Sequence, residues 1–177
     1  MDFQAESPEL WEFLGSLRHG ELLSGTVASI ESFGVFVSLD DGPPHPIFPG
    51  VGFVTVAELT WRHIEAISDA VQVGQRVTGE FLQFDTHNAE ARLSLKALRP
   101  DPFQAFADRT EVGRIMPGVV TKVAPPLGVF VRVEEGIEGL IRIPEEEPGD
   151  RPQPGEELTV VVAMVDRQGR RLLLHPA

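Results

Sequence analysis

Hydrophobic positions in this chain recur in short alternating runs, and the same order of runs occurs twice. The clearest pair is Phe-Gly-Val-Phe-Val at 33–37 and Leu-Gly-Val-Phe-Val at 127–131. Because the matches keep their order and nearly their spacing, the chain reads as a duplicated unit. The matched segments are 20–27 with 113–120, 33–37 with 127–131, 52–54 with 139–141, 74–85 with 155–166, and Arg-Leu-Ser-Leu at 92–95 with Arg-Leu-Leu-Leu at 171–174.

The period of these runs predicts strands. Apolar residues that alternate with polar ones between turn residues are typical of half-buried β-strands. Five such runs in each half predict an all-β protein of two tandem five-stranded Greek-key barrels. We place the first barrel at 18–99 and the second, shorter barrel at 113–177.

Short helices are expected at the N-terminus and between the barrels. Ser7 followed by Pro8 is a helix start, and apolar residues on one stripe after it predict a helix within residues 1–17 that caps the first barrel. Asp101 followed by a proline opens a second helix in the same way, within a linker at 100–112.

The two copies differ between their third and fourth strands. Residues 58–67 of the first copy, Glu-Leu-Thr-Trp-Arg-His-Ile-Glu-Ala-Ile, are expected to form a short helix. The corresponding stretch 144–154 of the second copy is rich in proline and acidic residues, which predicts a mobile loop instead.

The amino-acid composition and the absence of certain motifs limit the classes of function that we expect. The 177 residues include no cysteine, which excludes disulfides and thiolate chemistry, and the five histidines lack metal-ligand spacing. We find no phosphate loop, nucleophile elbow or catalytic carboxylate pair, so no enzyme, cofactor or metal is expected. Without an apolar run near membrane-spanning length, and with no leader at its start, the chain is expected to be a soluble cytoplasmic protein.

The net charge argues against strong attraction of nucleic acid. Fifteen basic and 27 acidic residues give a formal charge of −12, and a phosphate backbone is attracted first by positive charge. Screening over about 8 Å at physiological salt still lets a local basic patch act despite distant acids.

The repeated motifs together resemble two consecutive repeats of the bacterial ribosomal protein S-one family, particularly its actinobacterial form, with the second repeat diverged. The resemblance implies OB-type barrels that bind single-stranded RNA or messenger RNA on one face through aromatic and basic side chains, in translation or RNA metabolism. The ribosome or another protein would be a further partner. The stretches that carry the resemblance are 29–37, 58–64, 71–77, 93–97 and 118–123.

Two phenylalanines are the leading candidates for RNA contact in the first copy. An aromatic ring that is exposed on a strand stacks on a base and contributes about 1–3 kcal/mol. Phe33 and Phe36 would face opposite sides of a regular strand, but a bulge at Gly34 would bring both outward and leave Val35 and Val37 in the core. Burial of one or both rings is the alternative.

Phe53 and Arg92 complete the first candidate site. The family has a histidine where this chain has Thr55, and Phe53 shares the face of that position by alternation. Phe53 is therefore a replacement ring or a core residue. Arg92 matches the basic position of the family, or is a solvated arginine.

The second copy keeps one ring, Phe130, because Leu127 replaces the first phenylalanine. Arginine pairs with phosphate and also stacks on a base, so charge can substitute for stacking there. Acidic residues at 134, 135 and 138, and those that follow at 145–147, could equally neutralise that charge. The candidate residues around Phe130 are Lys122, Arg132, Arg142 and Arg170.

Three functions remain open from sequence. The first is non-catalytic binding of single-stranded RNA. The second is a protein-interaction module that keeps the fold but has lost most of its RNA binding. The net charge, Thr55, Leu127 and the acidic loop at 145–150 favour it. The third is an acidic surface that imitates nucleic acid and occupies a basic groove of another protein.

Overall fold

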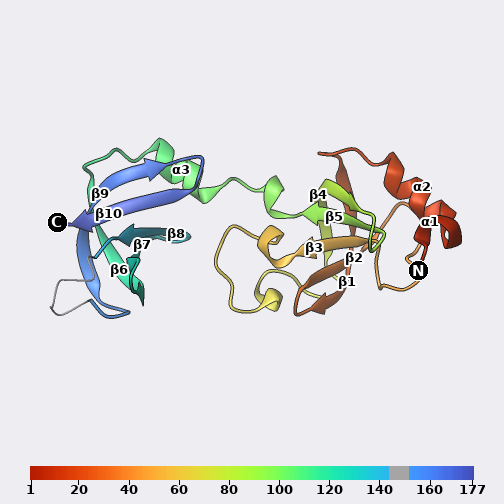
Figure 1. Ribbon diagram of the computed structural model, residues 1–177, viewed down its shortest axis with the longest axis horizontal. Coiled ribbons are helices and arrows are strands. Elements are labelled where there is room, and N and C mark those ends of the chain that lie inside the picture. Colours follow the sequence, from red (N-terminus) through yellow and green to blue (C-terminus); the bar gives the residue numbers. More distant parts are fainter. Residues whose placement is uncertain (144–151) are drawn as a thin grey trace. The chain divides into compact units, whose positions relative to one another are not determined.

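The computed structural model describes residues 1–143 and 152–177. The chain divides into two compact units, Met1–Arg99 and Pro100–Ala177, and each contains one barrel (Figure 1). Most of the loop that we expected at 144–154 lies outside the described residues. The elements of the first unit are α1 (Phe3–Glu6), α2 (Pro8–Ser16), β1 (Leu22–Glu31), β2 (Gly34–Leu39), β3 (Gly52–Thr55), η1 (Val56–Glu58), η2 (Ile67–Asp69), β4 (Arg76–Asp85), β5 (Glu90–Ser94) and η3 (Lys96–Leu98). Those of the second are α3 (Pro102–Asp108), β6 (Ile115–Ala124), β7 (Gly128–Glu134), β8 (Ile137–Ile141), β9 (Glu157–Asp166) and β10 (Arg171–Pro176).

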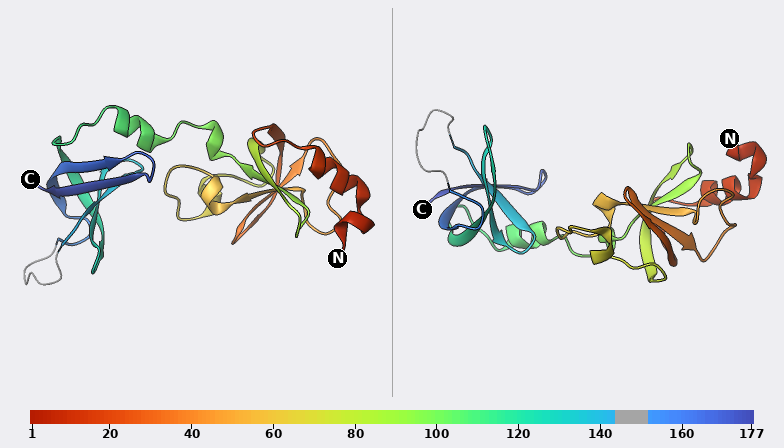
Figure 2. Two further views of the ribbon diagram at one scale, coloured as in Figure 1. Left: turned by 45° about the horizontal axis from the view of Figure 1, so that its top comes forward. Right: turned by 90° about the horizontal axis from the view of Figure 1, so that it is seen from below.

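Both sheets close into barrels of the same topology. The strand order of the first barrel is β1-β2-β3-β5-β4, and β4 pairs with β1 to close it. All neighbours are antiparallel except β3 and β5, which run parallel. The second barrel repeats this order with β6-β7-β8-β10-β9 (Figure 2). The predicted fold of two tandem five-stranded barrels is therefore confirmed.

Alternation along the strands builds each core. In the first barrel Val35 and Val37 of β2 are fully buried, as predicted, and pack with Leu93 of β5. In the second barrel Val129 and Val131 of β7 occupy the same places. The intervening residues of these strands therefore point to the outer face of each barrel.

The two predicted helices are present, and each belongs to one core. Helix α2 buries Leu10 and Leu14 against the first barrel. Helix α3 begins after Asp101, whose side chain accepts a hydrogen bond from the backbone N–H of Phe103 at 2.9 Å. It buries Phe103 and Phe106 in the second core, so this part of the expected linker is packed into the second unit.

The helix expected at 58–67 is wrong. Only the 3₁₀ turns η1 and η2 flank this stretch, and the residues between them are irregular. Leu59 is buried in the barrel core and Ile64 packs against it, while the ring N–H of Trp61 donates to the carbonyls of residues 96 and 99. Tertiary contacts of individual side chains thus override the local helical pattern.

The alignment of the closing strands by Arg-Leu-x-Leu is also wrong, by two residues. In the β4–β5 hairpin Asp85 pairs with Glu90, whereas in the β9–β10 hairpin Asp166 pairs with Arg171. The structural equivalent of Arg92 is therefore Leu173, which pairs with β8 as Arg92 pairs with β3. The pattern misleads because β-strands repeat every two residues.

Candidate nucleic-acid interface

Phe33 is the exposed ring of the first barrel, with 61% of its surface accessible. It lies in the turn before β2, and the bulge of this strand pair falls in β1, between Val27 and Ser29, rather than at Gly34. The expected bulge at Gly34 is thus wrong, although Phe33 and Phe36 do lie on one side. Gly34 has a φ of +156°, and an added Cβ would collide with the Phe53 ring and approach the Val54 carbonyl to 2.5 Å. Glycine here lets the ring of Phe53 lie against the strand.

Phe36 and Phe53 are buried beneath Phe33, so the expectation that Phe36 is exposed is wrong. They are paired across β2 and β3 and are only 5% and 4% exposed, yet neither belongs to the barrel's interior core. The Phe33 ring lies parallel to Phe53 with centroids 5.8 Å apart and at right angles to Phe36 at 6.2 Å. The buried rings therefore fix the orientation of the exposed one.

Sequence reasoning missed two members of this cluster, Phe48 and His45. Phe48 stacks on Phe36 with centroids 5.4 Å apart, and His45 packs against Phe48 at 4.7 Å. His45 Nδ1 accepts hydrogen bonds from the backbone N–H groups of Ile47 and Phe48, and its Nε2 donates to the carbonyl of Asn88. Both residues come from the loop before β3, where no periodic pattern could have placed them. We call Phe33, Phe36, Phe48, Phe53 and His45 the aromatic cluster.

Arg92 lies at the edge of the aromatic cluster. Its guanidinium carbon is 4.8 Å from the centroid of the Phe53 ring, and its Nη2 donates to Asp85 at 2.8 Å. Burial alone would raise the pKa of Asp85, but hydrogen bonds from Arg92, Asn88 and His87 hold that pKa below its ordinary value. Arg92 therefore contacts Phe53 and Asp85 with part of its side chain, and about a quarter of the side chain remains exposed.

Glu90 introduces a second carboxyl group beside this ion pair. It is 3% exposed, and burial raises its pKa to about 7 although Arg92 opposes the shift. One carboxylate oxygen of Glu90 and the Nε of Arg92 are buried without a hydrogen-bond partner among residues 1–143 and 152–177. The Glu90 carboxyl group beside Arg92 therefore becomes negatively charged as the pH rises through about 7.

The second barrel places basic residues around a single ring on the equivalent face. Phe130 of β7 is half-buried and lies opposite Lys122 of β6 on one side and Leu140 of β8 on the other. Arg132 follows Phe130 on the outer face, and Arg142 is exposed directly after β8. The structure thus brings four of the five predicted residues of this copy to one surface.

The acids at 134 and 138 bond to other partners, and those at 145–147 lie outside the described residues. Glu134 pairs with Arg109 at 2.5 Å, and Glu138 accepts a hydrogen bond from Thr121. Within residues 1–143 and 152–177, Lys122, Arg132 and Arg142 make no ion pair with a carboxylate.

Arg170 belongs to a different cluster. It lies in the β9–β10 turn, where it pairs with Asp101 at 2.9 Å and covers the Phe103 ring at 5.7 Å. It therefore fastens α3 to the second barrel.

Neither a metal-binding cluster nor a membrane-spanning helix is found in the part of the chain that the structure describes. No group of three or more His, Asp or Glu side chains there could hold a metal ion. None of the helices described is long and apolar enough to cross a membrane.

Comparison with known proteins identifies the repeated unit. The family model described as "S1 RNA binding domain" matches residues 16–96 and again 109–175. Small ribosomal subunit protein bS1 of Mycolicibacterium smegmatis is 43% identical over 97% of this chain, and the protein of that name from Staphylococcus saprophyticus is 31% identical over 92%. The chain spans only 35% and 41% of the lengths of these relatives. The resemblance seen in the sequence, including its actinobacterial character, is confirmed.

Proposed function

Since this chain belongs to the S1 RNA binding domain family, we propose that it binds single-stranded RNA without catalysing a reaction, in translation or RNA metabolism. Messenger RNA is the expected ligand, the ribosome the expected neighbour and the cytoplasm the expected location. Relatives named as ribosomal proteins support this role, although the chain spans 35% of the length of the Mycolicibacterium smegmatis protein.

One observation carries the proposal, namely an exposed ring on a preorganised support. Phe33 presents 61% of its surface to solvent while Phe36 and Phe53 hold it from below. A ring that is already fixed loses little conformational freedom when a base stacks on it. Arg92 beside Phe53 supplies a positive charge for the backbone of the same strand.

The second barrel contributes in a different way. Basic side chains lie around Phe130 in its site. The site has no exposed ring equivalent to Phe33, because Leu127, which is 59% exposed, occupies that place. We assign phosphate binding mainly to Lys122, Arg132 and Arg142 and stacking to Phe130.

A titration with labelled single-stranded RNA of mixed sequence, at two salt concentrations, tests the proposal. A duplex of the same length is the control ligand. We expect binding that prefers the single strand and a Phe33→Ala variant that binds about tenfold or more weakly, as loss of one stacked base predicts.

Leu22→Ala is the matched control, because Leu22 is exposed to a similar degree at 58% but is paired across the sheet with Glu80 of β4. If Leu22→Ala weakened RNA binding as much as Phe33→Ala, stacking on Phe33 would be the wrong mechanism. If the parent protein bound no single-stranded RNA even at low salt, the RNA-binding proposal itself would fail.

Docking of another protein is the second candidate function, and one feature of the second barrel favours it. Across the outer face, Phe130, Leu140, Leu173 and Met164 lie opposite one another in neighbouring strands. This row is apolar where the first barrel has Arg92. This function would be favoured if the parent protein bound no RNA and captured one protein partner at stoichiometric levels.

A further inference from the structure

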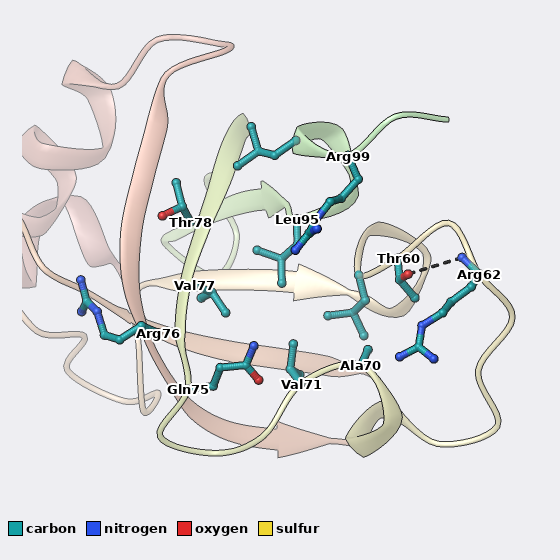
Figure 3. A pocket seen from close by; sticks show the side chains of 12 residues that line it. Thr60, Arg62, Ala70, Val71, Gln75, Arg76, Val77, Thr78, Leu95 and Arg99 are labelled. Atoms are coloured by element: carbon teal, nitrogen blue, oxygen red, sulfur yellow. Dashed lines mark hydrogen bonds between the residues drawn. The ribbon is translucent and has the colours of Figure 1, made fainter. Parts of the chain in front are cut away.

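A hollow of about 560 Å³ lies in the first unit and shares no residue with the aromatic cluster. It is formed where the irregular stretch after β3, the start of β4 and the turn after β5 meet (Figure 3). Its size is that of a small-molecule site. The residues that line it are Leu59, Thr60, Arg62, Ala70, Val71, Gln75, Arg76, Val77, Thr78, Leu95, Leu98 and Arg99.

Basic residues are concentrated at this hollow. Residues 1–100 contain only six Lys and Arg against fourteen Asp and Glu, and three of the six line the hollow. Arg76 is paired with Asp40 at 2.5 Å, and in Figure 3 its side chain points away from the other two. Arg62 and Arg99 make no ion pair with a carboxylate within the described residues. Two such arginines in a strongly acidic chain indicate a site for an anion from outside it.

Trp61 fixes both arginines in place. Its ring N–H is shared between the carbonyl oxygens of Lys96 at 2.9 Å and Arg99 at 3.1 Å, which ties the segment of Arg62 to the segment of Arg99. The Lys96 ammonium lies 4.3 Å from the Trp61 ring centroid and adds a positive charge. Arg62 is further oriented by donating from Nη2 to the carbonyl of Asp69.

The rest of the lining suits an organic group attached to the anion. Val71 and Leu59 are buried, and Val77 and Leu95 are half-buried, so they provide an apolar floor. Thr60 and Gln75 place polar side chains at its edge, and the guanidinium groups of Arg62 and Arg99 turn toward its middle in Figure 3. A flat, partly apolar group joined to a phosphate fits these features.

We propose that this hollow is a second binding site, which takes a nucleoside phosphate, with the phosphate held by Arg62 and Arg99 and the nucleoside on the apolar floor. The phosphate belongs either to a free nucleotide or to an RNA strand. Arginine suits this role because its planar fork donates two parallel hydrogen bonds to phosphate oxygens. The site does not depend on RNA binding by the aromatic cluster.

Titration of the full chain with adenosine monophosphate, followed through its backbone amide NMR signals, tests the site. We expect the signals of residues 59–62, 70–78 and 95–99 to shift, and we expect adenosine without phosphate to cause much smaller shifts. The Arg62→Gln and Arg99→Gln variants should each raise the Kd about tenfold, as loss of a hydrogen bond to a charged group predicts. Arg18→Gln, an exposed arginine outside the hollow, is the control for the same change of charge.

A short single-stranded RNA then distinguishes the two sources of the phosphate. If a strand occupies the hollow, the Arg62→Gln/Arg99→Gln double variant weakens RNA binding and lowers the salt slope by about 0.7, because the two arginines hold one phosphate. If only a free nucleotide occupies it, that variant loses the nucleotide but binds RNA like the parent.

The proposal is overturned if millimolar nucleotide leaves these signals unshifted and the double variant binds RNA like the parent. It is also overturned if Arg18→Gln weakens nucleotide binding as much as Arg62→Gln. The amide signals themselves report whether each variant is folded. The NMR signals report nucleotide binding at the hollow itself. This test therefore remains valid even if the Phe33→Ala variant binds RNA like the parent.

Discussion

Replacing Glu90 by glutamine should remove most of the pH dependence of the first barrel's stability near neutrality. Glu90 is buried at the start of β5 beside the Asp85–Arg92 ion pair, and one of its oxygens has no hydrogen-bond partner in the part of the chain that the structure describes. Burial raises its pKa from an ordinary 4.5 to about 7. Glutamine keeps the shape and the polar group but never carries the charge.

The sign and size of the effect follow from linkage. Because the folded pKa of Glu90 lies above the unfolded value, the stabilisation is fully present below pH 4.5 and is lost as pH rises through about 7. A shift of about 2.5 pKa units at 1.36 kcal/mol each amounts to about 3 kcal/mol. The depressed pKa of Asp85 acts oppositely, since its contribution is lost only as pH falls below its ordinary value.

Tryptophan fluorescence during urea unfolding isolates this barrel, because both tryptophans of the chain, Trp11 and Trp61, lie in the first unit. Between pH 5 and pH 8 the parent protein should lose most of the 3 kcal/mol in unfolding free energy. Glu90→Gln should stay nearly constant and be more stable than the parent at pH 8. Glu12→Gln, an exposed glutamate on α2, should follow the parent.

Parallel pH curves for the parent and Glu90→Gln would refute the reasoning. They would mean that water or a small backbone shift relieves the buried carboxylate, so that Glu90 ionises in the folded state as it does in the unfolded state. A lower stability of Glu90→Gln than of the parent at pH 8, where Glu90 is charged, would instead show that the charged form makes a favourable contact with Arg92.

Three further predictions concern the second unit. Leu127→Phe restores the ring that the first barrel has at Phe33, and should tighten RNA binding about fivefold in the titration described above, as about 1 kcal/mol of added stacking predicts. Phe106→Ala removes a fully buried ring of α3 and should destabilise this unit by about 3–5 kcal/mol, seen by circular dichroism in urea, while tryptophan fluorescence of the first unit is unchanged. Replacing Lys122, Arg132 and Arg142 by glutamine should lower the salt slope of RNA binding by about 2, whereas an unchanged slope would show that they contact no phosphate.

The fold could be predicted because its signals are local and repeated. Strand alternation, turn glycines and proline-marked helix starts each act over a few residues, and the two copies support each other. The helix at 58–67 and the match of Arg92 to Arg171 failed for a different reason. There a local pattern allowed two arrangements, and contacts with distant residues, such as Trp61 with the turn after β5, decided between them.

The candidate site could be predicted only in part. The sequence indicated Phe33 and Phe36 as candidate outward rings and left Phe53 open between a replacement ring and a core residue. It did not show that Phe36 and Phe53 bury each other under Phe33. Phe48 and His45 join them from an irregular loop, and no spacing rule places a loop ring against a strand ring. Exposure within an aromatic cluster depends on this three-dimensional packing, which periodicity does not contain.

The register of the closing strands explains why the two barrels should contact RNA differently. In the first barrel a cross-strand row runs Phe36, Phe53, Arg92, so a cation lies directly beside the rings that support Phe33. In the second, the equivalent place of Arg92 is taken by Leu173, and the cations lie around Phe130 instead. Stacking depends little on salt, whereas phosphate contacts release counterions and weaken as salt rises. The first barrel should therefore hold a strand at salt concentrations at which the second has released it, and the duplication gives one chain two sites that differ in their response to ionic strength.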